Sequence, residues 1–475
     1  MSITSAMSNA LSGLNAAGRQ AQAVSSNVAN ALTPGYARRE VQVSANAMGG
    51  VTAGRIDRRV DAAIVADRRT AEAELGNATL TTDALRRLAD LTGAATDPNS
   101  LSGRVARFEG TLIEAASAPQ SDTRLAAAVS AASELAATLN RASDGVQAER
   151  LRADTTIGRT VDDLRRGLER VAVLNREIAR QTASGHDAST LHDQRQVVID
   201  TLSAIAPLRE LPRDHGRVAL MTVAGQLLLD DRPVALEFTA SNAMDPFAVP
   251  GTPLSTLKID GREIDMTRPD GAMGGGSLAA AFDLRDRAGP DAQARLDVFA
   301  ADLQARFVSL VPAGSPALFT DPGPASAAAP HRGMAQRIEV NNLVDPSRGG
   351  DAWRLRDGLT ASAPGPAGDA RLLDAMAKVM AQPRPDPVTS PTGLSRSLGA
   401  HADGVLSLAH GALFRAEDGQ SFAAGRADAL RQQEMELGVD TDQEMQSLLL
   451  IERTYGANAR VLQAADAMLQ RLMEI

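Results

Sequence analysis

Two features of this sequence could in principle support chemistry, and the first is a pair of histidines. The chain has six histidines and no cysteine, and only His186 and His192 lie near each other, in the stretch GHDASTLHD. A zinc site needs further ligands at tighter spacing, and without cysteine there is no thiolate ligand or nucleophile. We therefore expect these histidines to belong to a loop and the start of a helix, with no metal bound.

The second feature is the glycine-rich stretch GAMGGGSL, which follows a strand-like run and precedes a helical pattern. That is the context of a phosphate-binding loop, but the Walker lysine and the glycine spacing of a dinucleotide fingerprint are absent. We expect residues 271–277 to form a flexible hinge, and a nucleotide-handling enzyme stays only as an alternative hypothesis. No Ser-His-Asp or paired-carboxylate arrangement stands out. The sequence thus predicts no catalytic residues and no cofactor.

Composition favours a helical protein without a nucleic-acid or membrane partner. The chain has 475 residues, room for about three domains, and only 3% of them are aromatic. A core of Ala, Leu and Val favours closely packed helices, because strands are enriched in β-branched and aromatic residues. A net charge of −9 argues against nucleic acid and anionic membrane surfaces. No apolar run reaches 18 residues, and no secretory signal pattern opens the chain.

Apolar residues at helical spacing dominate the middle of the chain. The longest such segment, 122–182, predicts a rod of roughly 90 Å at about 1.5 Å per residue, with Gly145 and Gly158 as places for a kink or break. From 217 to 267 the period drops towards two, with an Asp260-Gly261 hairpin signal. Shorter strands are expected at REVQVSA and RIEV. Further helices are expected at 60–93, 105–112, 191–205, 278–307 and 394–437.

The first 33 residues form a nearly chargeless amphipathic helix. Every seam position of its heptad is apolar, and Arg19 is the only charge on the opposite face. Small uncharged polar side chains on that face would let a second helix approach, so we expect both faces to be buried by other copies of the chain; a poorly soluble terminal tail is the alternative. The predicted interface residues here are Ile3, Met7, Ala10, Leu14, Ala17, Ala21, Val24 and Val28.

A hard stop follows this helix, and a second heptad stripe ends the chain. Proline cannot continue a helix and glycine supplies a turn, so we expect an elbow formed by Thr33, Pro34, Gly35 and Tyr36. The C-terminal stripe has Asn458 as its one polar residue. Its predicted interface residues are Leu448, Ile451, Tyr455, Leu462, Ala465, Leu469 and Leu472.

These elements predict a mainly α, multidomain α+β protein with a small β insert and discontinuous domains. Both ends of the chain are amphipathic helices that would pair in a coiled-coil-like layer, and the intervening chain would then leave from and return to the same place. We expect a terminal domain of 1–33 plus 441–475, a helical body of 34–205 plus 277–440, and a small β domain of 206–276.

Both ends of the chain resemble a known protein group. ALSGLNAAGRQAQAVSSNVANALTPGYARREV and GVDTDQEMQSLLLIERTYGANARVLQAADAMLQRL are similar to the terminal motifs of bacterial flagellar rod, hook and hook-associated proteins. Within that group, LHDQRQVVIDTLSAIAPL and GGSLAAAFDLRD resemble internal motifs of the flagellar hook-associated protein 1, or FlgK, family. The β-rich outer region common in that family is short here.

The resemblance implies a structural role and no enzymatic activity. Such proteins form the hook-filament junction outside the cell, where their terminal helices stack around a channel. Implied partners are further copies of the chain, the hook protein, a second hook-associated junction protein on the filament side, and a cytoplasmic export chaperone for the C-terminal helix. Export would use the flagellar type III apparatus. We expect disordered termini in the free monomer and a protease-resistant core near 40–435; another axial rod or hook protein is the alternative.

Overall fold

The longest element of the computed structural model is α4, Asp122–Ala183, a single helix of 62 residues. The predicted rod is therefore continuous, and neither Gly145 nor Gly158 breaks it. Gly145 serves close packing instead, because a Cβ at that position would lie 2.3 Å from Leu91 Cδ2. The Ser121 side chain caps the helix by accepting a hydrogen bond from the Arg124 amide.

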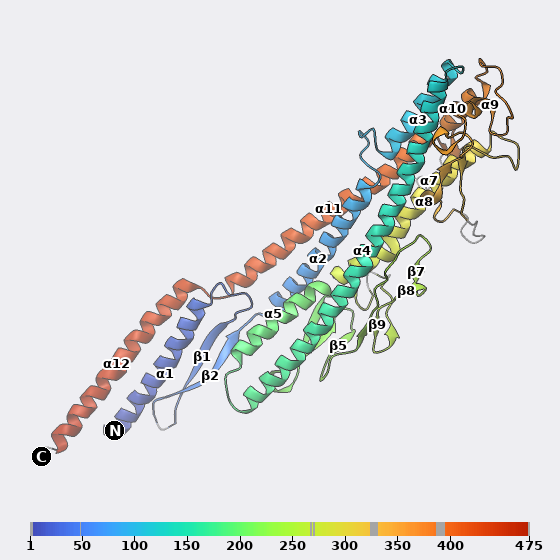
Figure 1. The fold of residues 1–475 in the computed structure, drawn as a ribbon. Helices are drawn as coiled ribbons and strands as arrows, with labels where there is room; N and C mark the ends of the chain where they lie inside the picture. Colours follow the sequence, from blue (N-terminus) through green and yellow to red (C-terminus); the bar gives the residue numbers. More distant parts are fainter. Residues whose placement is uncertain are drawn as a thin grey trace.

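The structure describes residues 3–47, 49–266, 268, 271–323, 331–385 and 395–473. They form an elongated, mainly α molecule with small sheets, as predicted, in which α4 is the spine (Figure 1). The helices along the spine begin and end within a few residues of the predicted bounds. Position 394, where the last body helix was expected to start, lies outside the described residues. These helices are α2 (Ala62–Asp90), α3 (Leu101–Ser117), α5 (Ser189–Ile205), α6 (Ser277–Asp283), α7 (Gly289–Val308) and α11 (Leu398–Glu436).

One end of the body is built around three phenylalanines that contact one another in edge-to-face and tilted arrangements. Phe108, Phe307 and Phe319 are almost fully buried, with ring centroids 5.1–5.8 Å apart. The predicted RIEV strand is present as β12 (Glu339–Val340), paired antiparallel with β11 (Phe319–Thr320). The other elements of this end are α8 (Met334–Arg337), α9 (Arg354–Asp357), α10 (Arg371–Ala381), β13 (Arg384–Pro385) and β14 (Ser395–Arg396).

The β insert packs against the other half of α4. Its Asp260-Gly261 hairpin is confirmed, since Asp260 has φ 48° and Gly261 φ 77°, as a two-residue hairpin turn requires. The strands form two three-stranded sheets, ordered β3-β4-β5 and β10-β9-β6, and a parallel pair, β7-β8. Their bounds are Leu208–Pro212 (β3), Val218–Thr222 (β4), Leu227–Leu229 (β5), Leu236–Glu237 (β6), Val249–Pro250 (β7), Pro253–Leu254 (β8), Lys258–Ile259 (β9) and Arg262–Glu263 (β10).

A buried polar network joins the insert to the body. Arg285 and Asp154 are both fully buried and paired at 2.6 Å, and Arg285 lies in a π-helical turn, Leu284–Ala288, between α6 and α7. Arg150 donates to the carbonyl oxygens of Asp245 and Ala248 in the insert. These charged side chains hold loop backbone against α4.

The glycine stretch has a packing role where a flexible hinge was expected. A Cβ on Gly276 would lie 2.1 Å from the carbonyl oxygen of Ile205, and one on Gly275 would lie 3.1 Å from Pro207 Cγ. The missing side chains therefore let the start of α6 pass close to the end of α5.

The two ends of the chain meet at one tip of the molecule, where α1 (Ile3–Ala29) and α12 (Thr441–Met473) lie side by side (Figure 1). The predicted REVQVSA strand is β1 (Arg38–Ala45), which pairs antiparallel with β2 (Val51–Arg59). The pairing is irregular between Val41 and Val43, opposite an extra residue of β2. Val41 is buried, whereas Val43 is 40% exposed because it lines a cavity beside α1.

Candidate assembly interface

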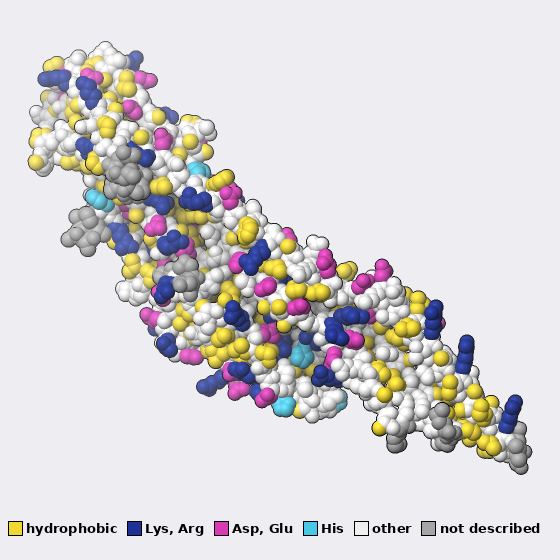
Figure 2. All heavy atoms as spheres, turned by 180° about the vertical axis from the view of Figure 1, so that it is seen from behind, with side chains coloured by type: hydrophobic (Ala, Val, Ile, Leu, Met, Phe, Trp, Pro, Cys, Tyr) yellow, Lys and Arg dark blue, Asp and Glu magenta, His cyan; other side chains and the backbone are white. Residues whose placement is uncertain are grey.

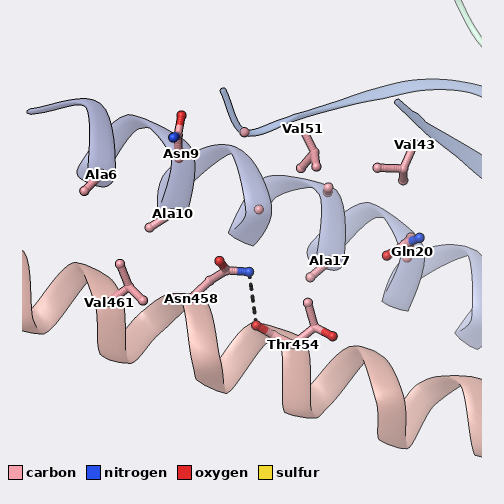
Figure 3. Close-up of a pocket in the computed structure, with 13 residues that line it drawn as sticks. Ala6, Asn9, Ala10, Ala17, Gln20, Val43, Val51, Thr454, Asn458 and Val461 are labelled. Carbon is pink, nitrogen blue, oxygen red and sulfur yellow. Dashed lines mark hydrogen bonds between the residues drawn. The ribbon is translucent and has the colours of Figure 1, made fainter. Parts of the chain in front are cut away.

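The terminal helices contact each other through small side chains. Gly13 of α1 faces Asn458 of α12, the one polar residue of the predicted C-terminal stripe, and Asn458 Nδ2 donates to the Thr454 carbonyl oxygen at 3.1 Å (Figure 3). A cavity of about 420 Å³ lies between α1, α12 and the β1-β2 hairpin. Alanines and glycines line much of it, so the backbones of the two helices approach closely.

The polar face of α1 contacts the chain's own hairpin. Ser12 Oγ accepts from the Val51 amide at 3.1 Å, and Arg19 Nη1 donates to the Ala53 carbonyl oxygen at 2.7 Å. The side-chain amide of Asn27 makes two hydrogen bonds with the backbone of Arg39. Its Oδ1 accepts from the Arg39 N–H and its Nδ2 donates to the Arg39 carbonyl oxygen, both at 2.9 Å. Within this chain, the element that approaches the small polar side chains is therefore a hairpin rather than a second helix.

The predicted α1 seam is only partly covered within this chain. Its members are distributed as follows: Ala10, Ala17 and Val24 are buried, Ile3, Met7, Leu14 and Ala21 are half-buried, and Val28 is exposed. Ala16, Ala23 and Asn27 are buried as well. Because α1 packs against both α12 and the hairpin, its covered surface is wider than the predicted heptad seam. The middle of that surface lies to one side of the seam.

A third face of α1 is exposed, and Arg19 is the one charged residue beside it. Its residues recur at spacings of 4 and 3, and Leu11, 54% exposed, is the large apolar member. The exposed row consists of Thr4, Ser8, Leu11, Asn15, Gly18, Gln22, Ser25 and Ala29. A solvated helix face normally carries many charged residues, so this row has the composition of a contact surface.

The C-terminal helix has two apolar faces, of which α1 covers one. Of the predicted stripe, Ala465 is buried and Leu448, Ile451, Leu462 and Leu469 are half-buried, while Tyr455 and Leu472 are 51% and 60% exposed. A second, exposed stripe was not predicted apart from Leu472, although its recurrence every 3, 4 or 7 residues is a sequence signal. It consists of Leu450, Ala457, Val461, Ala464, Met468 and Leu472, of which Val461 also lines the cavity beside α1.

Seen from behind, the narrow tip shows hydrophobic side chains on its surface and basic side chains along one edge (Figure 2). The basic residues on α12 are Arg453, Arg460 and Arg471. Leu450 is 65% exposed and Met468 56% exposed. Large apolar side chains in a continuous row on a helix mark an interaction surface more often than scattered exposed hydrophobic residues do.

The predicted elbow is an ordered turn anchored on the body. Thr33 and Pro34 are exposed, and Gly35 has φ 75° beside Val197 of α5. The Tyr36 hydroxyl donates to Asn27 Oδ1 at 2.9 Å, and partial burial raises the pKa of Tyr36. The α-helix ends at Ala29, earlier than the sequence indicates, and turns fill the remaining residues to the elbow.

Asp193 of α5 joins this end of the molecule to the body. Its carboxylate accepts from Arg39 Nη2 at 3.0 Å and from Arg58 Nη2 at 2.7 Å, so it contacts both strands of the hairpin. On the other side of β1, Arg38 Nε pairs with the buried Glu444 Oε1 at 2.6 Å and holds the start of α12. Sequence reasoning did not find these residues, because their partners lie far apart in the chain.

The two neighbouring histidines have separate structural roles. His186 Nδ1 lies 2.9 Å from Ser184 Oγ, and His192 Nδ1 lies 3.1 Å from Arg195 Nη2. Burial, with Arg195 and Arg58 nearby, lowers the pKa of His192 to about 4. Among the described residues, no group of three or more His, Asp or Glu is placed to hold a metal.

Comparison with known proteins agrees with this architecture. Residues 85–314 match the family described as flagellar hook-associated protein FlgK helical domain, which spans α4 and the β insert. Residues 436–475 match the family described as flagellar basal body rod FlgEFG protein C-terminal. The chain belongs to the FlgK family. These matches confirm the family resemblance, and they cover the internal motifs and the C-terminal motif.

Relatives of this FlgK-family chain include flagellar hook-associated protein 1 from Escherichia coli strain K12 and from Salmonella typhimurium strain LT2. The first is 22% identical over 296 residues, 60% of this chain and 53% of the relative. The second is 24% identical over 296 residues, 60% of this chain and 52% of the relative. The alignments therefore span about half the length of these relatives.

A solved structure of the flagellar hook junction protein FlgK from Burkholderia pseudomallei is also similar. It shares 19% identity and a TM-score of 0.45, over 54% of this chain and 46% of that one. Within the part of the FlgK-family chain that the structure describes, no helix is both long and apolar enough to cross a membrane.

Proposed function

We propose that this FlgK-family chain is a non-enzymatic structural adaptor of the bacterial flagellum. It forms the hook-filament junction by self-assembly through α1 and α12, with the elbow at residues 33–36 setting the direction in which the body leaves the assembled helices. Its other partners are the hook protein, a second hook-associated junction protein on the filament side, and an export chaperone that holds α12 in the cytoplasm. Its site of action is extracellular, after export through the flagellar type III apparatus.

The single observation that carries the proposal is the pair of uncovered faces on the terminal helices. The row on α1 has no charge, and the stripe on α12 exposes Leu450, Val461 and Met468. Fully burying one such side chain contributes about 1.5–3 kcal/mol. A polymer in which neighbouring copies cover these faces would gain that contribution many times, while a free chain gains none of it.

A deletion strain tests the proposed place in the flagellum. We expect complete hooks, no filaments, and flagellin lost to the medium, because filament subunits would have no base on which to polymerise. A strain that lacks hooks would support the alternative role as a rod or hook protein. A strain with normal filaments would contradict any role in the axial structure.

Two substitutions on α12 test the surface itself. Leu450→Asp and Met468→Asp place charge on positions of the exposed stripe that do not line the cavity between α1 and α12, and should abolish filament formation while the protein is still made and folded. Ile113→Asp on α3 is the control, since Ile113 is also 56% exposed but lies far from the tip. Normal motility with both α12 variants together would rule out this stripe as the assembly surface.

The state of the free monomer is a separate test. If neighbours supply most of the burial, the terminal helices should exchange amide hydrogen rapidly in dilute solution, and limited proteolysis should leave a core near residues 40–435. Assembly should then protect both ends. Strong protection of residues 3–29 in the dilute monomer would contradict assembly-dependent ordering.

A further inference from the structure

A cavity of about 390 Å³ lies where the hairpin, α2, α5 and the β3-β4 sheet meet. Its lining is strongly basic: Arg58, Arg69, Arg195 and Arg209 face Glu210 as the one acidic residue. It is separate from the exposed stripes of α1 and α12. The assembly function above does not use it.

Arg195 is buried in this wall, and no carboxylate of the described residues pairs with it. It is 7% exposed and donates to Asn175 Oδ1 at 2.9 Å and to the Gly216 carbonyl oxygen at 2.7 Å. Its Nη2 also donates to His192 Nδ1 at 3.1 Å, so this nitrogen of the imidazole is the acceptor and the ring is neutral. All three acceptors are uncharged, and an arginine side chain keeps its charge when buried. Among the described residues, no negatively charged group therefore contacts Arg195 to balance its positive charge.

Arg69, on the wall formed by α2, is 4% exposed. Its Nε donates to Asp200 Oδ1 at 2.6 Å and its Nη1 to Glu210, but Nη2 is buried with no hydrogen-bond partner among the described residues. Buried donors are nearly always bonded, so an unpaired one is a candidate contact for a ligand.

The acidic residues near the cavity do not neutralise the positive charge of its arginines. Asp193 is already shared between Arg39 and Arg58, and Glu210 is paired with Arg69. Arg209 is exposed and has no ion-pair partner among the residues that the structure describes. Arg58 and His192 also line a neighbouring cavity of about 610 Å³, where Arg19 and Arg55 are offset by Asp57 and Asp187, so the excess of positive charge belongs to the smaller cavity. The hollow therefore carries more positive than negative charge.

We propose that this cavity binds a small oxyanion of the phosphate or sulfate type. Guanidinium groups are suited to such ions, because their planar donors match oxyanion geometry and form charge-assisted hydrogen bonds. Arg195 and Arg69 supply the buried donors and Arg209 the charge at the rim. A bound ion would tie α2 and α5 to β3 beside Arg58 of β2, and so stiffen the joint between the hairpin and the body.

The test uses the full chain with inorganic phosphate or sulfate against chloride at equal ionic strength. We expect saturable stabilisation by phosphate, with the unfolding temperature raised by about 1–3 °C at ten times the dissociation constant, and saturable heat in a calorimetric titration. Chloride should give neither. An effect that only follows ionic strength, with no saturation, would overturn the proposal.

Three variants assign the effect to the cavity. Arg195→Gln should abolish the phosphate-dependent shift, and Arg209→Gln, at the exposed rim, should weaken phosphate binding severalfold without unfolding the chain. Arg170→Gln on α4 is the control, since this exposed arginine lies outside the cavity and its loss changes the net charge equally. Equal loss of binding in Arg170→Gln, or unchanged binding in Arg209→Gln, would contradict the site even if Arg195→Gln does not fold. Motility of the Arg209→Gln strain is expected to be normal, so failure here leaves the assembly proposal standing.

Discussion

Asn458 lies against Gly13, so close that a Cβ on Gly13 would be 2.6 Å from Asn458 Nδ2 and 2.8 Å from its Cγ. One residue is near the start of the chain and the other near its end. The amide is held by its bond to the Thr454 carbonyl oxygen, so it cannot turn away without losing that bond. A single glycine thus fixes how the two terminal helices meet, in the way that a buried asparagine can fix the register of a coiled coil.

Gly13→Ala should destabilise the terminal contact by about 1 kcal/mol, because the clash with Asn458 outweighs the higher helix propensity of alanine. Gly419→Ala on α11 is the control outside the terminal helices: nothing lies within 4 Å of its added Cβ, so the same substitution should stabilise its helix by about 0.5–1 kcal/mol. Hydrogen exchange of the helix that carries each substitution, in the assembled protein, measures both. The double variant Gly13→Ala with Asn458→Ala should recover most of the loss, and equal behaviour of the two single variants would contradict this contact.

Asp193→Asn should loosen the hairpin from the body. The substitution removes the charge that Arg39 and Arg58 share, in a side chain only 13% exposed, and should cost about 2–3 kcal/mol. Urea unfolding measures the loss, and β1 and β2 should lose more hydrogen-exchange protection than α4 does. Asp162→Asn, in an exposed pair with Arg165, should change stability by less than about 0.5 kcal/mol. A loss of similar size in both variants would show that Asp193 has no special role.

Stability should fall as the pH decreases from about 6.5 to 4, and His192 should contribute to this fall. Burial and then Arg195 and Arg58 lower its pKa from 6.5 to about 4, and the nearby Asp193 and Asp187 only partly oppose them. The unfolded chain therefore binds a proton in this window that the folded chain does not, which favours unfolding by about 1–2 kcal/mol after allowance for the partial exposure of the ring.

His192→Asn isolates that contribution, because asparagine keeps an acceptor for Arg195 and does not titrate. The unfolding free energy of the unsubstituted protein minus that of His192→Asn should be constant above pH 7 and decrease towards pH 4. Groups such as Asp297, whose pKa is raised by burial, cancel in the difference. A difference independent of pH would show that His192 does not titrate with a lowered pKa.

Arg285→Met should be severely destabilising, by about 3–5 kcal/mol, because it leaves Asp154 fully buried without its cation. Arg287→Met is the control on the same turn, since Arg287 is 65% exposed in a pair with Asp283, and its loss should cost less than about 0.5 kcal/mol. Chemical denaturation measures both. A mild effect at Arg285 would mean that the pair contributes little to holding the π-helical turn.

Sequence patterns predicted most helices because their signals are local. The apolar spacing in α4 and the turn residues Asp260 and Gly261 act over a few neighbouring positions, and the structure follows them. Some local signals were missed: α10 was not predicted, although its buried Leu373, Met376 and Met380 have helical spacing. The glycines were harder to interpret, because Gly145 and Gly276 look like breaks until Leu91 and Ile205 are seen beside them.

By itself, the sequence determined that both chain ends are helices with apolar stripes and that a turn follows the first, because periodicity and the conformational limits of proline and glycine are properties of neighbouring residues. Only the tertiary structure decided that the polar face of α1 receives the chain's own hairpin and that the stripe from Leu450 to Leu472 stays open. Tertiary structure also brought Asp193 to Arg39 and Arg58, and Arg69 to Arg195. Heptad spacing shows that a face is apolar, whereas which partner covers it depends on residues hundreds of positions away.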